Sequence, residues 1–146
     1  MSAAAGTLAA APPVAVPADK VPLSRVFAFL AMVFGMFMAI LDIQIVSASL
    51  TEIQAGLAAS TNEITWVQTA YLIAEVIMIP LSGFLSRALG TRIVFATSAA
   101  GFTLASVMCG FSTSINQMIL WRAIQGFIGG GMIPSVFAVA FSLFPR

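Results

Sequence analysis

Three charged residues, Asp42, Glu75 and Arg122, stand inside long stretches of the sequence that are otherwise uncharged. A carboxyl group near an arginine can lose and regain a proton as the two groups approach and separate. Inside a membrane, however, a charge costs at least about 2.5 kcal/mol, so each of these side chains needs a partner or a purpose. We therefore consider all three as candidates for a proton-coupling site.

The composition excludes most other site chemistry. The chain has no histidine and one cysteine, Cys109, which lies in an apolar run and is interpreted as a structural thiol. A Ser-His triad, an intrachain disulfide and a cysteine metal cluster are therefore not available. We expect neither an enzyme nor a metal or cofactor site, and a net charge of +1 argues against nucleic acid as a partner.

The residues around these charges indicate a membrane protein. Of 146 residues, 60% are hydrophobic and 8% are charged, whereas about a quarter of a typical soluble domain is charged. A helix of about 20 apolar residues crosses a bilayer. We expect an all-α transmembrane fold with four spans, at about residues 26–50, 63–85, 93–111 and 116–144. Residues 1–24, rich in alanine and proline, are predicted to be a disordered cytoplasmic tail, and residues 25–146 the transmembrane region.

The charges of the connecting segments predict an orientation. The basic residues outside the predicted spans all fall on one side of the membrane, and they are Lys20, Arg25, Arg87, Arg92 and Arg146. The other side carries Glu52 and Glu63 and no base. Because basic loops stay in the cytoplasm, both ends of the chain are expected there.

Asp42 and Arg122 are predicted to lie at the same depth. Each is six to eight residues from the outer end of its span, or roughly 9–12 Å at 1.5 Å per residue. Matching depth and opposite charge favour an ion pair. It could simply orient two helices, or it could take part in a proton-coupled cycle in which Asp42 loses its proton.

Glu75 lies near the middle of the second span, on one helical face with Gln68 and Tyr71. A polar face on a membrane helix contacts protein or water rather than lipid. The face could line a cavity in which Glu75 attracts a cation or carries a proton. Alternatively, a neutral Glu75 makes a hydrogen bond between helices.

Small residues on the fourth span predict how the helices meet. Gly126, Gly130 and Pro134 are spaced four apart, and such spacing lets helix backbones approach closely. Consecutive glycines followed by a proline also favour a bend.

The segment after the second span carries the first family resemblance. Residues 83–92 read Gly-Phe-Leu-Ser-Arg-Ala-Leu-Gly-Thr-Arg, which resembles the signature loop between the second and third helices of the major facilitator family. The matching residues are Gly83, Arg87, Gly90 and Arg92, and the resemblance implies a loop that acts as a conformational switch. Ser86 replaces the usual aspartate.

Two further motifs are similar to the EmrB/QacA-like branch of drug:proton antiporters. In the fourth span, Arg122, Gln125 and Gly126 match an Arg-x-x-Gln-Gly motif, for which a proton-transfer role of the arginine is proposed in the family. In the first span, residues 41–50 resemble the antiporter motif that contains the membrane aspartate, here Asp42.

The resemblance implies part of the N-terminal half of a major facilitator fold, engaged in proton-coupled efflux of drugs or other amphipathic small molecules. The cavity for the transported molecule would be lined by Gln68, Tyr71, Glu75 and Gln125. The resemblance implies a location in the inner membrane, and a periplasmic adaptor with an outer-membrane channel as partners. We expect a fragment that is inactive alone. The alternative is a self-contained four-helix membrane protein that acts as an oligomeric scaffold or small channel.

Overall fold

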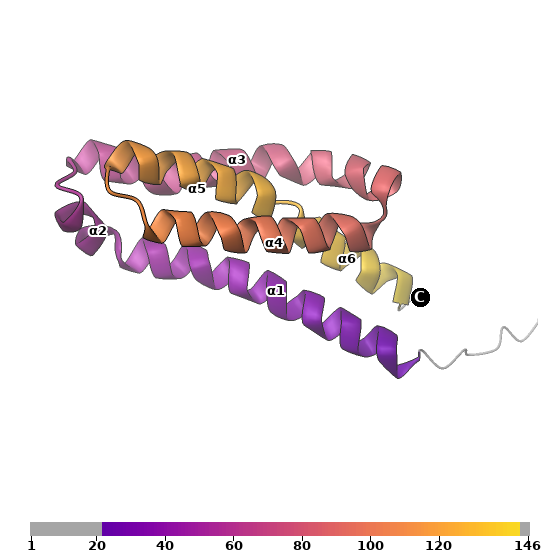
Figure 1. Cartoon of the computed structure of the whole chain (residues 1–146). Helices are drawn as coiled ribbons and strands as arrows, with labels where there is room; N and C mark the ends of the chain where they lie inside the picture. The colour runs from indigo at the N-terminus through magenta and orange to yellow at the C-terminus, as the bar shows by residue number, and fades with distance from the viewer. Residues whose placement is uncertain (1–21, 144–146) are drawn as a thin grey trace, which may run out of the picture.

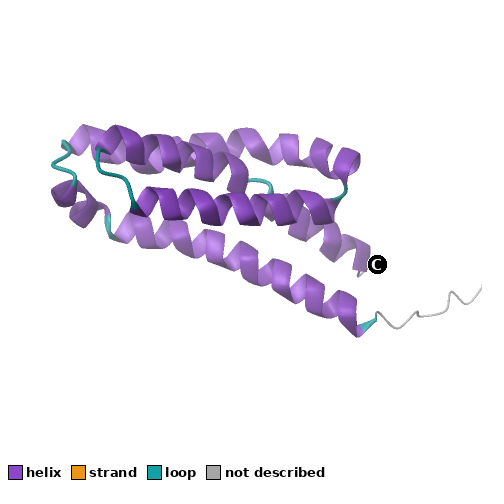
Figure 2. Ribbon diagram, viewed as in Figure 1, coloured by secondary structure: helices purple, strands orange, loops and turns teal. Residues whose placement is uncertain are grey.

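The fold consists of helices joined by short connections, in a computed structural model that describes residues 22–143. All regular secondary structure in this part of the chain is helical (Figure 2). The helices are α1 (Leu23–Ala48), α2 (Leu50–Gly56), α3 (Thr61–Leu89), α4 (Thr91–Gly110), α5 (Ile115–Gly129) and α6 (Met132–Leu143). Figure 1 shows α1, α3, α4 and the α5–α6 pair running side by side along the bundle.

Four segments are long and apolar enough to cross a membrane, namely α1, α3, α4 and α5 together with α6. Most of their large apolar side chains face outward, as shown by Phe34, Val76 and Leu104, each more than 60% exposed. Such surfaces suit contact with lipid rather than water. The predicted all-α transmembrane class is confirmed, and the chain is a multi-pass membrane protein.

Polar caps begin the two helices that start at the α2 end of the bundle. At α3, the Ser60 N–H donates to Glu63 Oε2 at 2.8 Å, and the Glu63 N–H donates to Ser60 Oγ at 3.3 Å. At α5, the Ser114 hydroxyl accepts from the Gln117 N–H at 3.4 Å. These side chains satisfy amide groups that have no partner within the helix, and so fix where each span starts.

The ends of the predicted segments differ from those in the structure. The first helix begins at Leu23, so Leu23 and Ser24 are helical rather than part of the predicted tail, while residues 1–21 of that tail lie outside the described residues. The predicted loop of residues 51–62 contains the short helix α2. The length of an apolar run predicts the part of a helix that lies inside the membrane, but the helix can continue past the membrane surface.

The predicted switch loop is almost entirely helical. Gly83 and Arg87 lie within α3 and Arg92 lies within α4, so Gly90 alone separates the two helices. Its φ of +88° is disfavoured for residues with a side chain. The residues before it favour helix, which explains why α3 runs to Leu89 rather than ending at residue 85.

The fourth span is interrupted at Gly130 and Gly131, the two residues between the end of α5 at Gly129 and the start of α6 at Met132. Pro134 lies in the first turn of α6, where its missing N–H removes no bond of the helix. After the interruption α6 packs against α1, whereas α4 contacts the span on both sides of it. The core combines all four spans, with Ala39 from α1, Tyr71 from α3, Phe102 from α4 and Met132 from α6.

Glycines bring α5 against the backbone of α3. A Cβ at Gly126 would overlap the carbonyl oxygen of Tyr71, and a Cβ at Gly130 would lie 2.8 Å from the carbonyl oxygen of Glu75. Such contacts with rigid backbone are possible only where there is no side chain. The two helices therefore pack more closely than they could if these positions carried a side chain.

We expect Gly126→Ala to destabilise the protein by about 1–3 kcal/mol, because the added methyl group meets backbone that cannot rotate away. Gly83→Ala is the matched control, since a Cβ at Gly83 meets nothing within 4 Å. The measurement is thermal unfolding of the purified protein in detergent. A Gly126→Ala protein as stable as the control would contradict the close contact.

Candidate functional site

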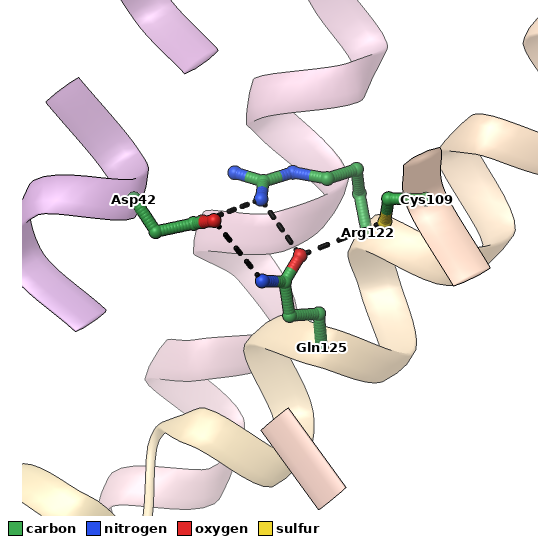
Figure 3. Close-up of polar contacts among 4 residues, drawn as sticks. All are labelled: Asp42, Cys109, Arg122 and Gln125. Carbon is green, nitrogen blue, oxygen red and sulfur yellow. Dashed lines mark hydrogen bonds and ion pairs between the residues drawn. The ribbon is translucent and has the colours of Figure 1, made fainter. Parts of the chain in front are cut away.

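An ion pair joins α1 to α5 inside the bundle. Arg122 Nη1 donates to Asp42 Oδ2 at 2.6 Å, although the two residues are 80 positions apart (Figure 3). The Arg122 side chain is 2% exposed and that of Asp42 is 18% exposed. The pair predicted from depth and charge is therefore present in the structure.

Gln125 closes this pair into a three-residue network. Arg122 Nη1 also donates to Gln125 Oε1 at 2.7 Å, while Gln125 Nε2 donates to Asp42 Oδ1 at 3.2 Å. Gln125 is fully buried and lies three positions after Arg122, on the same face of α5. Figure 3 shows the Gln125 amide beneath the guanidinium, with dashed lines to both Arg122 and Asp42. Sequence analysis assigned Gln125 to the substrate cavity and missed this bridging position.

Cys109 of α4 reaches the same network. Its Sγ lies 3.6 Å from Gln125 Oε1, in the geometry of a weak thiol hydrogen bond (Figure 3). The apolar neighbours of Cys109 in the sequence gave no sign of this contact, which depends on how α4 rotates against α5. The Gln125 amide thus contacts one residue of α1, one of α4 and one in the preceding turn of its own helix, α5.

Tyr71 lies beneath the guanidinium group rather than beside an open cavity. The Arg122 Cζ is 4.4 Å from the centre of the Tyr71 ring, a cation–π contact. The side chain is fully buried in the core of the described residues, and its place in a substrate cavity stays a prediction. Gln68 is half-buried, and its Oε1 is buried without a hydrogen-bond partner in the part of the chain that the structure describes.

Glu75 does not join the network. It lies one turn beyond Tyr71 on α3, is half-buried, and makes no side-chain hydrogen bond or ion pair with residues 22–143. Arg87 and Arg92 are exposed and likewise make no ion pair within this part of the chain. The three membrane charges of the sequence therefore divide into a bonded pair and a separate carboxyl group.

Two cavities lie among the spans. One, here called the α2-end cavity, has a volume of about 190 Å³ and is lined by Asp42, Arg122 and Gln125, together with Val46, Ile53, Ser106, Cys109, Gly110 and Met118. The other is an apolar groove of about 270 Å³ between α3, α4 and α5. Gln68, Tyr71 and Glu75 line neither cavity, so of the four predicted substrate-cavity residues only Gln125 does. No three His, Cys, Asp or Glu side chains within residues 22–143 gather closely enough to hold a metal ion.

Known proteins are similar in sequence to this chain over most of its length. The chain is 55% identical over 118 residues to the colistin resistance protein EmrB of Acinetobacter baumannii, which covers 81% of this chain and 23% of that protein. It is 36% identical over 105 residues to the fatty acid resistance protein FarB of Neisseria gonorrhoeae, covering 72% of this chain and 21% of the relative. Identity to the multidrug export protein EmrB of Escherichia coli K12 is 37% over 105 residues, covering 72% and 20%. The matched region thus spans between a fifth and a quarter of these relatives.

A model of the family described as Major Facilitator Superfamily matches residues 32–146. That range takes in most of α1 and every later helix, including Asp42, Arg122 and Gln125. The EmrB-like relatives confirm the resemblance predicted from the motifs. The chain therefore belongs to the Major Facilitator Superfamily of membrane transporters.

Proposed function

We propose that this protein acts in proton-coupled efflux of drugs or other amphipathic small molecules, with Asp42, Arg122 and Gln125 as its coupling site. The observation that carries the proposal is the ion pair itself, since Arg122 and Asp42 meet at 2.6 Å within the spans. A structural pair could be replaced by apolar residues, often with no loss of stability. Its presence among apolar helices supports a role in function.

Protonation gives the site two states. With Asp42 ionised, the pair is neutral overall and α1 is held to α5. With Asp42 protonated, the attraction between the charges is lost, while Arg122 keeps the amide oxygen of Gln125 and the Tyr71 ring as partners. Proton binding thus weakens the contact between two spans, which is how a proton can drive a conformational change.

The relatives support the class of substrate. Their names refer to resistance to colistin, resistance to fatty acids and export of multiple drugs. Colistin and fatty acids are both amphipathic, so we propose amphipathic molecules as the substrates. Glu75 as a second proton-coupling group, and a periplasmic adaptor with an outer-membrane channel, stay predictions.

The proposed location is the inner membrane, with the N-terminus in the cytoplasm. Arg25 near the start of α1, Arg87 in the last turn of α3 and Arg92 at the start of α4 lie at the end of the bundle opposite α2 (Figure 1). Glu52 and Glu63 lie at the α2 end. The positive-inside rule then places the α2 end in the periplasm.

We expect a cysteine introduced at Asn62 to react with a membrane-impermeant maleimide added to intact cells, and a cysteine at Ala88 to react only after the cells are opened. Both positions are exposed, at opposite ends of α3, and Cys109→Ser provides the background. Labelling of Ala88→Cys alone in intact cells would reverse the proposed orientation.

We expect Asp42→Asn, made in a transporter of the relatives' full length that contains this chain, to reduce proton-driven dye efflux to the level of cells without the protein, because asparagine cannot carry the proton. The shape of the side chain is kept, but Arg122 loses its counter-charge, so efflux is compared at equal amounts of folded protein in the membrane. Glu52→Gln, which removes an exposed carboxylate on α2, is the matched control and should transport normally. Full proton-driven efflux by Asp42→Asn would exclude Asp42 as the coupling group.

A further inference from the structure

We propose that the α2-end cavity is a water-holding vestibule through which protons reach Asp42, and that Ile53 of α2 closes its mouth. This inference rests on the proposed function and adds the route to the coupling site. The cavity is lined at one end by the ion pair and extends away from it, since Val46 follows Asp42 by one turn and Met118 precedes Arg122 by one turn.

The size and walls of the cavity suit water. Its 190 Å³ greatly exceeds the ~15 Å³ that a single water needs, and a buried water also needs two or more polar partners. Asp42 and Gln125 provide such partners at the inner end of the cavity. Asp42 keeps 18% of its side chain exposed, so its carboxylate is not sealed by protein.

Ser106 provides a further polar group in the wall of the cavity. Thr103, three positions earlier on α4, donates its hydroxyl to the Ala99 carbonyl at 2.9 Å, as hydroxyls in apolar helices commonly do. The Ser106 hydroxyl makes no hydrogen bond with residues 22–143, although it lines the cavity and is half-buried. A water molecule in the cavity would satisfy it.

Arg122 holds spare donors beside the cavity. Its Nη1 serves both Asp42 and Gln125, whereas Nε and Nη2 are buried without a hydrogen-bond partner among residues 22–143. Figure 3 shows these two nitrogens on the edge of the guanidinium that points away from Gln125. They are sealed in the present packing, and a small shift of the guanidinium when Asp42 is protonated would let them bind water. Unmade bonds of this kind in a native protein call for a bound water or a change of state.

Ile53 is placed to control entry. It is the one lining residue that comes from outside the four spans, on a short helix at the outer end of the bundle (Figure 1). An apolar side chain at the mouth of a cavity with polar groups at its inner end interrupts a chain of water molecules, as apolar constrictions do in channels. The titratable groups around the cavity are Asp42, Arg122 and Cys109, with Tyr71 beneath the guanidinium and Glu52 beside Ile53 on α2.

The cysteine in the cavity wall provides the test. Cys109 is the single cysteine of the sequence, and a thiol reacts with a charged methanethiosulfonate only where water reaches it. We expect a membrane-impermeant trimethylammonium methanethiosulfonate, added from the α2 side of proteoliposomes, to modify Cys109 slowly. Ile53→Ala should speed the reaction about tenfold, which corresponds to a barrier lower by about 1.4 kcal/mol.

Ile45→Ala is the matched control, because Ile45 adjoins Val46 but is 61% exposed and does not line the cavity. Cys109→Ser gives the background, and labelling in denaturant shows that the thiol is intact. The proposal is overturned if Ile53→Ala leaves the rate unchanged, if Ile45→Ala raises it equally, or if Cys109 reacts only from the opposite side. These labelling rates do not depend on transport, so they test the vestibule alone. Normal efflux by Asp42→Asn would instead overturn the coupling site.

Discussion

The ion pair between Asp42 and Arg122 is the interaction on which the rest of the structure depends. Either charge alone within the spans would be strongly unfavourable, by about 3–5 kcal/mol once its partner is removed. The pair can form only if α1 and α5 meet at a matching depth, although 80 residues separate the two side chains. The lengths and tilts of the intervening helices must satisfy that condition.

Close packing of α5 on α3 directs Arg122 toward its partner. Arg122 lies four residues before Gly126, so the two share a helical face. Because Gly126 packs against the Tyr71 backbone, that face is turned into the bundle and away from lipid. The guanidinium then lies over the Tyr71 ring and extends to Asp42. A residue with no side chain thus fixes the position of the longest buried one.

Charge and hydropathy were sufficient to predict the spans and the ion pair, because both follow from position along the membrane normal. The rotation of each helix was not predictable in the same way. A polar face on α3 suits either a cavity or the core, and the structure places Tyr71 in the core. Likewise, apolar length did not show that α3 continues helically to Leu89, because helix propensity and membrane thickness are separate constraints.

The two kinds of contact made by α5 differ in their response to a proton. At Gly126 and Gly130 its contact with α3 is backbone against glycine, which does not depend on the charge of Asp42. Its polar contact with α1 depends on the charge of Asp42. When Asp42 is protonated, Arg122 still has Gln125 and Tyr71 and need not leave the bundle. Under the proposed coupling, α3 and α5 therefore move as one unit, and α1 is the span whose attachment the proton weakens.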